Sequence, residues 1–295
     1  MTNSIPLSLT AIGLGYCARH LVMSRPGLFV PVVGTARSAE KLADMPAGVQ
    51  PLPFDGETLA PELAHALSRT DILLVSAPPD ERGDPVLRAA GEALALGQVK
   101  QVVYLTTLGV YGDHQGGWVD ETGPTHGESP RLQRRLDAEA AWLAFGEARN
   151  IPVAVLRLAG IYGPGRNVLT QLRAGTARII DKPGQVFNRI HVEDVARAIE
   201  AVVEQRFSGL LNVTDDLPAA SGEPIMFGAQ LLGMPSPPVV PFEEAAKAMH
   251  PMALSFWASS KRVSNARLTK ELGVELAYPT YQRGLKALAE AGEGA

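Results

Sequence analysis

The sequence predicts an α/β protein with a doubly wound parallel sheet and a smaller C-terminal lobe. From the start of the chain to about residue 215, short apolar runs alternate with longer amphipathic stretches. Parallel strands are covered by helices on both faces, so they are continuously apolar, whereas the covering helices are apolar on one side. After residue 160 prolines divide the chain into short segments. This change in composition predicts a second lobe, built partly from insertions.

The apolar runs set the expected order of elements. Strands are predicted at Leu7 to Ile12, Phe29 to Gly34, Val49 to Phe54, Ile72 to Ser76, Val102 to Thr106 and Val153 to Leu158. Helices are predicted at Gly15 to Arg25, Thr58 to Leu67, Pro85 to Leu96 and Leu132 to Arg149. A further strand is expected from Phe207 to Val213. Such a sheet places ligands at the carboxyl ends of its strands, near the point where the strand order reverses.

Composition excludes several classes of protein. The chain has 295 residues, is 46% hydrophobic and carries a formal net charge of -4, with no run of basic residues. We therefore expect neither nucleic acid nor an acidic membrane surface as a partner. The N-terminus has no basic region of a signal peptide, which predicts a cytoplasmic protein. Cys17 is the only cysteine, so no internal disulfide and no cysteine-rich metal site is expected.

A glycine turn follows the first predicted strand. The run Gly13-Leu14-Gly15-Tyr16-Cys17-Ala18 fits the G-x-G-x-x-G/A fingerprint of dinucleotide-binding proteins between a strand and a helix. Gly13 permits the tight turn, Gly15 lets the backbone approach a pyrophosphate, and Ala18 allows close packing of helix on strand. The alternative is a plain turn. We expect this run, with Leu14 and Tyr16 included, to bind the cofactor.

The end of the second strand favours NADP over NAD. No Asp or Glu lies about 20 residues after the glycines, where a carboxylate would bind the ribose 2′-hydroxyl of NAD. Arg37 lies there instead, and a guanidinium can bind a 2′-phosphate through charge-assisted bonds. The alternative is an exposed arginine beside a helix start. Residues 1–162 are thus predicted to form a Rossmann-type NAD(P)-binding domain, and residues 163–295 mainly the substrate lobe, with 186–215 returning to the sheet.

Other strand ends supply further candidate cofactor contacts. Asp55 could accept a bond from the adenine amino group, although a turn or helix-capping aspartate would look similar. Ala77 and Pro78, after the fourth strand, suit a backbone that passes under the cofactor, and a plain loop is the alternative. Thr106, at the end of the fifth strand, is a further candidate cofactor contact.

Four stretches resemble the extended short-chain dehydrogenase/reductases, the superfamily of sugar-nucleotide epimerases and dehydratases. They are Thr106 to Asp113 (TTLGVYGD), Arg157 to Gly165 (RLAGIYGPG), Asn188 to Ala196 (NRIHVEDVA) and Leu211 to Asp215 (LNVTD). The resemblance implies a cofactor-dependent enzyme acting on a hydroxyl or carbonyl of a nucleotide sugar or related metabolite. The usual T-G-x-x-G-x-x-G loop is replaced by the shorter glycine turn, as in an atypical branch.

The catalytic Y-x-x-x-K pair of that superfamily is missing. No lysine lies between Lys100 and Lys182, and no tyrosine between Tyr111 and Tyr162. Counting back from Glu139 places Arg135 at the Lys position and Arg131 at the Tyr position. A guanidinium stays protonated, so it can orient or stabilise a negative oxygen but cannot exchange a proton.

Other residues are candidates for the missing chemistry. Thr107 matches the hydroxyl that bonds the reacting substrate oxygen in the superfamily, with a strand-end residue as the alternative. Tyr111 and His114 could transfer a proton, although a core tyrosine and a solvated histidine are the alternatives. Arg131, Arg134 and Arg135 could receive a phosphate or carboxylate, or form a solvated basic face.

Several remaining features have open interpretations. The glycine-rich loop 112–122 could close on a substrate, with Trp118 on the ligand or in the core. His191 is expected to be structural, and Asp194 to cap its helix. Lys261, Arg262 and Asn265 are candidate substrate contacts or part of a surface helix that Gly273 ends. The segment Pro235 to Trp257 could line the substrate pocket or form a homodimer contact.

Two functional hypotheses follow. The first is an NADP-binding oxidoreductase or epimerase-like enzyme with non-standard acid/base residues, with NAD as the alternative cofactor. The second is a non-catalytic NADP-binding protein with a regulatory or scaffold role. Both predict cofactor binding, so only turnover separates them.

Overall fold

A seven-stranded sheet forms the centre of the fold. The computed structural model describes residues 6–294, and the strand order is β11-β7-β5-β4-β1-β2-β3. The strands are β1 (Leu7–Ile12), β2 (Phe29–Ala36), β3 (Val49–Pro53), β4 (Ile72–Val75), β5 (Gln101–Thr107), β7 (Val153–Leu158) and β11 (Gly209–Val213). Strand β1 pairs in parallel with β2 on one side and with β4 on the other. The strand order reverses there, and the predicted doubly wound sheet is confirmed.

The chain divides into two compact units. The first unit comprises residues 1–107, 129–157 and 195–211, and the second comprises 108–128, 158–194 and 212–295. The predicted ranges, 1–162 and 163–295 with 186–215 returning, divide the chain differently. Residues 108–128 belong to the second unit because the chain leaves the sheet after β5. The segment that returns to the first unit is also shorter than predicted.

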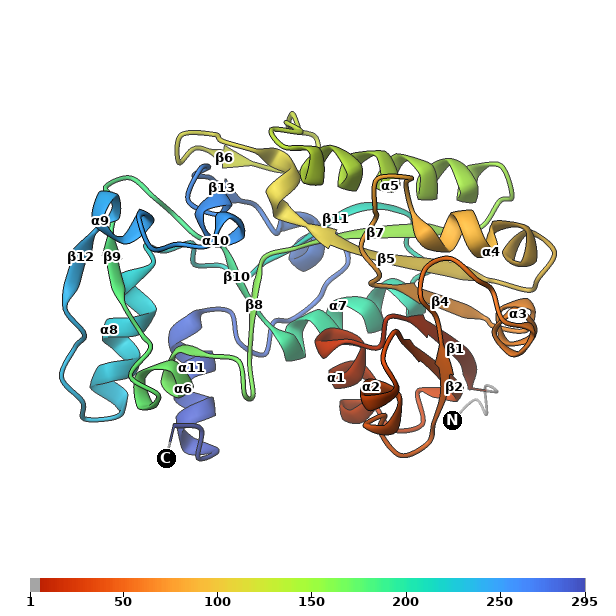
Figure 1. The fold of residues 1–295 in the computed structure, drawn as a ribbon, viewed down its shortest axis with the longest axis horizontal. Helices are drawn as coiled ribbons and strands as arrows, with labels where there is room; N and C mark the ends of the chain where they lie inside the picture. Colours follow the sequence, from red (N-terminus) through yellow and green to blue (C-terminus); the bar gives the residue numbers. More distant parts are fainter. Residues whose placement is uncertain (1–5, 295) are drawn as a thin grey trace. The chain divides into compact units, whose positions relative to one another are not determined.

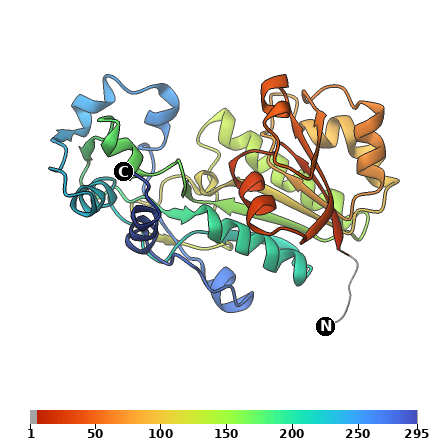
Figure 2. The same cartoon turned by 90° about the horizontal axis from the view of Figure 1, so that it is seen from below.

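Helices cover both faces of the sheet (Figure 1). Those in the first unit are α1 (Tyr16–Ser24), α2 (Ala39–Ala43), α3 (Pro61–Ser68), α4 (Pro85–Ala95), α5 (Pro130–Glu147) and most of α7 (Val192–Glu204). Side chains of α3, α4 and α5 share one apolar core with the strands, in which Tyr104 and Trp142 have ring centroids 6.1 Å apart. Figures 1 and 2 show α1 and α7 on the other face, where Arg25 Nε lies 2.7 Å from a Glu200 carboxylate oxygen.

Local sequence explains where these helices begin. Ser129 caps α5 by accepting a bond from the Leu132 amide at 3.3 Å. Asp84 caps α4 by accepting bonds from the amides of Val86 and Leu87. A proline occupies the first helical position in both cases, where its missing N–H costs nothing. The predicted bounds of α4 and α5 therefore fall within a few residues of those observed.

The second unit is built from short elements. Its strands are β6 (Trp118–Val119), β8 (Gly160–Tyr162), β9 (Ile179–Asp181), β10 (Arg189–His191), β12 (Val239–Pro241) and β13 (Arg262–Val263). Its helices are α6 (Val168–Arg173), α8 (Gly222–Leu231), α9 (Phe242–Ala246), α10 (Pro251–Ser255) and α11 (Tyr281–Glu290), with a 3₁₀ turn η1 (Leu108–Tyr111) and a π-helical turn η2 (Arg267–Glu271). The strands pair in parallel as β10-β8, β12-β9 and β13-β6. Within residues 6–294, no helix is both long enough and apolar enough to span a membrane.

Candidate functional site

The glycine turn has the geometry that the sequence predicts. Gly13 has a φ of +84°, in the left-handed region, and a Cβ added there would lie 2.9 Å from Ser76 Oγ. Its amide donates to Thr35 Oγ1 at 2.9 Å, and the Leu14 amide donates to the Thr35 carbonyl at 2.9 Å. At Gly15 an added Cβ would meet nothing closer than the Gly13 carbonyl oxygen at 3.9 Å. The peptide before α1 is therefore open to close approach by a phosphate, which fits a dinucleotide.

A cavity of about 540 Å³ extends from this turn within the first unit. Seven of the predicted cofactor residues line it: Gly13, Leu14, Gly15, Arg37, Asp55, Ala77 and Pro78. They come from the exits of β1, β2, β3 and β4, the expected edge of a doubly wound sheet. The cavity is large enough for a dinucleotide's adenosine half.

Three predicted cofactor residues lie outside the described lining of this cavity. Ala18 is 1% exposed, which suits the helix-packing role of the third fingerprint position. Tyr16 is the first residue of α1. Thr106 is buried in β5. The contacts predicted for these side chains stay predictions, and for Thr106 the burial favours a structural role.

Asp55 forms a turn. Its Oδ1 accepts bonds from the amides of Glu57 at 2.8 Å and Thr58 at 3.0 Å, and these bonds lower the pKa of the carboxyl. This geometry matches the turn alternative considered for Asp55. Because Asp55 also lines the cavity, the carboxylate can still face a ligand.

Sequence reasoning missed several polar residues of the cavity, among them Ser38 and Lys41. Ser38 caps α2, and its Oγ accepts a bond from the Lys41 amide at 3.4 Å. The sequence does hold a signal for the start of α2, because Ser38 is a residue type preferred at helix N-caps and Lys41 follows it by three residues. It was overlooked because α2 has five residues and buries none of them.

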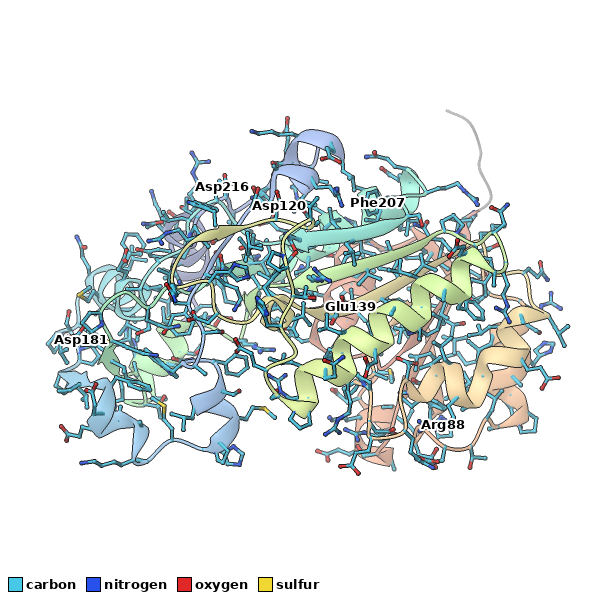
Figure 3. The ribbon with its side chains drawn as sticks, turned by 90° about the horizontal axis from the view of Figure 1, so that it is seen from above. Arg88, Asp120, Glu139, Asp181, Phe207 and Asp216 are labelled. Carbon is cyan, nitrogen blue, oxygen red and sulfur yellow. The ribbon has the colours of Figure 1, made fainter. Side chains whose placement is uncertain are left out.

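The inner face of α5 holds a buried ion pair. Glu139 and Arg157 are 3% and 4% exposed, and an Arg157 Nη lies 2.7 Å from a Glu139 carboxylate oxygen. Burial raises the pKa of Glu139, and Arg157 opposes that shift. Figure 3 shows Glu139 on the side of α5 that faces the sheet. The pair fixes α5 against β7.

The arginines at the missing Tyr and Lys positions lie on the same helix. Arg135 Nη1 lies 3.5 Å from the Leu105 carbonyl oxygen in β5. Burial, and after it the charge of Arg135, lowers the pKa of Arg131. Both are half-buried, so neither belongs to a fully solvated basic face. Thr107 is half-buried at the end of β5, where the resemblance predicts the substrate-facing hydroxyl.

Tyr111 and His114 have structural contacts. Tyr111 is fully buried, and its hydroxyl donates to Asn212 Oδ1 at 2.8 Å. His114 Nε2 lies 3.1 Å from the Tyr111 carbonyl oxygen. These contacts favour the core and loop interpretations, and a catalytic role for either residue stays a prediction.

Two further candidate residues in the second unit, His191 and Asp194, also form structural hydrogen bonds. His191 is buried, and its Nδ1 accepts a bond from the Glu193 amide at 3.1 Å. The Asp194 carboxylate accepts bonds from the amides of Ala277 at 2.6 Å and Tyr278 at 3.0 Å, so it anchors a distant segment.

The segment after Ser259 differs from the predicted surface helix. Lys261 is 7% exposed, and its Nζ donates to the Gly112 carbonyl at 2.8 Å and to Ser259 Oγ at 3.0 Å. Burial lowers the pKa of Lys261 to about 8. Arg262 belongs to β13 and bonds the Gly116 carbonyl, while Asn265 Nδ2 donates to the Thr214 carbonyl at 3.0 Å. The surface-helix interpretation was therefore wrong for Lys261.

The glycine-rich loop 112–122 is tied down in the second unit. The amides of His114 and Gly116 both donate to the Ser260 carbonyl, at 3.0 and 2.9 Å. Strand β6 pairs with β13, with Trp118 opposite Arg262. The Trp118 side chain is 64% exposed, which excludes the core alternative.

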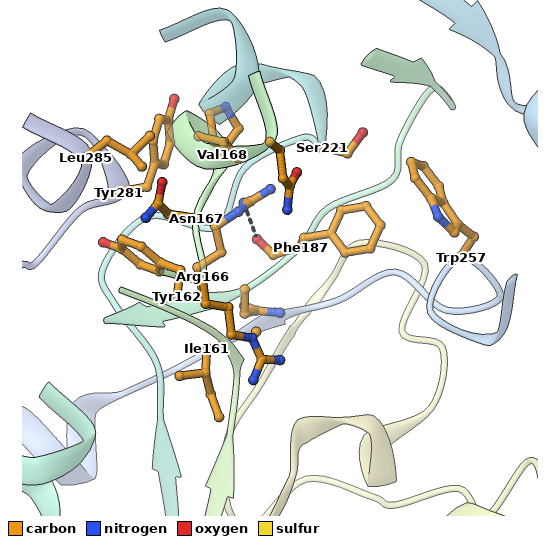
Figure 4. A pocket seen from close by; sticks show the side chains of 15 residues that line it. Ile161, Tyr162, Arg166, Asn167, Val168, Phe187, Ser221, Trp257, Tyr281 and Leu285 are labelled. Atoms are coloured by element: carbon orange, nitrogen blue, oxygen red, sulfur yellow. Dashed lines mark hydrogen bonds between the residues drawn. The ribbon is translucent and has the colours of Figure 1, made fainter. Parts of the chain in front are cut away.

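The second unit contains a cavity of its own, of about 340 Å³ (Figure 4). Its lining combines aromatic, cationic and amide side chains, among them Phe187, Trp257, Tyr281, Arg166, Arg189 and Asn167. The rings of Phe187 and Trp257 meet edge to face with centroids 4.9 Å apart. The guanidinium of Arg189 donates to the main-chain carbonyls of Phe187 and Ala219, at 3.1 and 3.2 Å. Of the segment Pro235 to Trp257, only Trp257 is among the described lining residues.

Known proteins share this fold and parts of the sequence. Residues 84–213 match the "NAD dependent epimerase/dehydratase family". This match covers less than half of the chain. The match, together with a 26% identical solved structure of a putative NAD-dependent epimerase/dehydratase, confirms the predicted resemblance to the epimerases and dehydratases.

Individual relatives extend the comparison. A functionally unknown conserved protein from Silicibacter pomeroyi is 42% identical, with a TM-score of 0.85 over 97% of this chain and 99% of that one. A Streptomyces protein named 3-diazoavenalumate denitrifying reductase is 31% identical over 137 residues, which cover 44% of this chain and 45% of the relative. Human epimerase family protein SDR39U1, solved with NADPH, shares the fold at 20% identity and a TM-score of 0.72, covering 96% of this chain and 99% of that one.

Proposed function

We propose that the chain is an NADP-dependent oxidoreductase or epimerase-like enzyme that acts on a hydroxyl or carbonyl of a sugar nucleotide or related metabolite. The observation that carries the proposal is the first-unit cavity, with the open glycine turn at one end and Arg37 at another. When bound, the nicotinamide would supply or accept a hydride. The family match supports the cofactor class, and the cavity supports the choice of NADP.

Arg37 is the residue on which the choice of NADP rests. It is exposed at the exit of β2 and, within residues 6–294, forms no ion pair. A phosphate would therefore meet a guanidinium with no competing carboxylate. Charge-assisted bonds of this kind contribute about 1.5 to 3 kcal/mol.

Thr107 is the proposed substrate-orienting group. Its hydroxyl can hold the substrate oxygen at the carboxyl end of β5. Arg131 and Arg135 can stabilise negative charge there but cannot exchange a proton. Losing a positioned acid or base costs about 10² to 10⁴ in rate. We therefore expect slow turnover, with protons exchanged through solvent or a residue other than a Tyr and Lys pair.

The second-unit cavity is proposed to bind the nucleotide part of the substrate. Guanidinium groups suit phosphates, and aromatic rings suit a nucleobase. Arg166, Arg189 and the Phe187 and Trp257 rings supply both chemistries within one cavity.

A non-catalytic NADP-binding regulatory protein is the second candidate. It is favoured by the structural contacts of Tyr111 and Arg135, because both side chains bond other parts of the fold. Under this proposal cofactor binding is retained while turnover is absent.

Nicotinamide absorbance against a panel of nucleotide sugars separates the two candidates. We expect turnover that falls on Thr107→Val, an isosteric change that removes the hydroxyl. Tight cofactor binding with no turnover would support the regulatory protein.

Calorimetry with NADPH and NADH tests the cofactor. Arg37→Ala should weaken NADPH by roughly 10- to 150-fold and leave NADH unchanged. Equal weakening of both coenzymes would refute the role of Arg37.

A further inference from the structure

A tight turn carries Arg166 to the wall of the second-unit cavity. The Gly163 amide donates to the Arg166 carbonyl, and the Arg166 amide donates to the Gly163 carbonyl, both at 3.0 Å. Pro164 and Gly165 occupy the two central positions, and Gly165 has a φ of +69°. Proline followed by a glycine with a positive φ is typical of a type II turn. The Gly165 amide takes no part in the two bonds that close this turn.

Glu293 binds the turn from a distant part of the sequence. One of its carboxylate oxygens accepts a bond from the Gly165 amide at 3.0 Å, and the other accepts a bond from Asn167 Nδ2 at 3.0 Å. Bonds to an ionised carboxylate are stronger than bonds between neutral groups. The two oxygens therefore hold the residues on either side of Arg166.

Asn167 is a structural residue of this wall. It is 4% exposed, and its Oδ1 caps α6 by accepting bonds from the amides of Leu169 at 2.9 Å and Thr170 at 3.1 Å. Its Nδ2 donates to the Gly163 carbonyl at 2.9 Å as well as to Glu293. An asparagine amide can make four such bonds, so Asn167 has none left for a ligand. Among these neighbours, the group that can bind a phosphate is the guanidinium of the turn.

The end of α11 fixes the position of Glu293. Gly292 has a φ of +88°, and the Glu293 amide donates to the Leu288 carbonyl at 2.9 Å, which is the closing bond of a Schellman motif. The same helix contributes Tyr281 and Leu285 to the cavity lining (Figure 4). Helix α11 therefore supplies one part of the cavity wall directly and holds another part through the residue that follows its cap.

We propose that Glu293 is a positioning residue for the second-unit cavity, because it holds the turn 163–166 so that the Arg166 guanidinium meets a phosphate group of the ligand. The inference rests on the proposed function, which places the nucleotide part of the substrate in this cavity and gives no role to the segment after α11. Without Glu293, a ligand would have to order the turn and the long arginine side chain as it binds. Glu293 thus raises the affinity for phosphate without touching the ligand.

Calorimetry with UDP and with uridine tests this role. Glu293→Gln keeps the size of the side chain, but its amide nitrogen is a donor, so it cannot accept both bonds. The Kd for UDP should rise roughly 3- to 10-fold, as expected when one long side chain must be ordered on binding. The Kd for uridine, which carries no phosphate, should stay unchanged. Glu290→Gln is the matched control, because Glu290 is exposed on the same helix and lies 3.9 Å from Lys286.

A double variant shows whether Glu293 acts through Arg166. Arg166→Ala should raise the Kd for UDP roughly 10- to 100-fold, as expected for one charged contact to phosphate. Adding Glu293→Gln should raise it no further, because no guanidinium remains to be positioned. Losses that add up would show that Glu293 acts by another route and would overturn the proposal. The Kd for NADPH reports on the first unit and should be the same in every variant.

The outcomes separate this inference from the proposed function. If the wild-type protein binds UDP and Glu293→Gln binds it equally well, the positioning role is wrong while the proposed function stands. Equal loss of UDP and uridine in Glu293→Gln would also overturn the role, because it indicates a general effect on the cavity. If the wild-type protein does not bind UDP, the proposed nucleotide site fails, and the positioning role fails with it.

Discussion

Replacement of Asp215 tests how burial controls the stability of the second unit. Asp215 is 1% exposed, and its Oδ1 accepts a bond from the Leu217 amide at 3.1 Å. Its Oδ2 has no hydrogen-bond partner within residues 6–294. Burial raises the pKa of this carboxyl from 3.8 to about 8, and the charge of Arg189 opposes the shift only in part.

The sign of the pH dependence follows from this shift. A raised pKa means that the folded protein holds a proton that the unfolded chain releases between about pH 4 and pH 8. The contribution to stability is therefore complete below pH 4 and is lost as the pH rises toward 8. The slope from this one group is at most about 1.4 kcal/mol per pH unit. Relaxation around the charge reduces the total, and we expect about 2 to 3 kcal/mol across the window.

Urea unfolding at several pH values, followed by tryptophan fluorescence, measures the effect. Asp215→Asn keeps the acceptor for Leu217 but cannot ionise. Its free energy of unfolding should match the wild type at about pH 4 and exceed it by about 2 to 3 kcal/mol at pH 8. Asp181→Asn, at an exposed position of the same unit, should follow the wild-type curve. Parallel curves for Asp215→Asn and the wild type would refute the reasoning.

Two further predictions concern packing within each unit. Glu139→Gln should cost about 3 to 5 kcal/mol of unfolding free energy, because it removes the carboxylate that balances the buried Arg157 charge. Adding Arg157→Met should recover most of that loss, and an additive double variant in urea unfolding would contradict the pairing. Gly284→Ala should cost about 1 to 3 kcal/mol by overpacking, since its Cβ would overlap the Tyr162 hydroxyl and lie 2.8 Å from the ring. Adding Tyr162→Phe should reduce the cost, and a melting temperature that shows no such rescue would speak against this contact.

The sequence predicts the first unit well because its determinants are local. Strands β1 and β7 have the predicted bounds, since each is a mostly apolar run. The glycine turn is likewise predictable, because the backbone freedom of Gly13 does not depend on distant residues. Helix α2 was missed because five exposed or half-buried residues carry no apolar periodicity. Because α2 was not predicted, Ser38 and Lys41 were not predicted as residues of the cavity.

The second unit is less predictable because distant residues position its side chains. Strand β8 has three residues and pairs with β10, which lies nearly thirty positions later in the chain. The burial of Lys261 depends on the Gly112 carbonyl, and that of Tyr111 on Asn212. No local pattern in the sequence records such contacts.

The same contrast separates cofactor binding from catalysis in this chain. Cofactor binding depends on backbone amides and on side chains next to a turn, so departures such as Ala18 in place of a glycine still leave a usable site. Proton transfer depends on one group with a suitable pKa at one place, and Arg131 and Arg135 cannot supply it. Their helix is nevertheless held firmly by the Glu139 and Arg157 pair. We therefore expect an activity that uses these two arginines to depend on charge stabilisation more than on proton exchange.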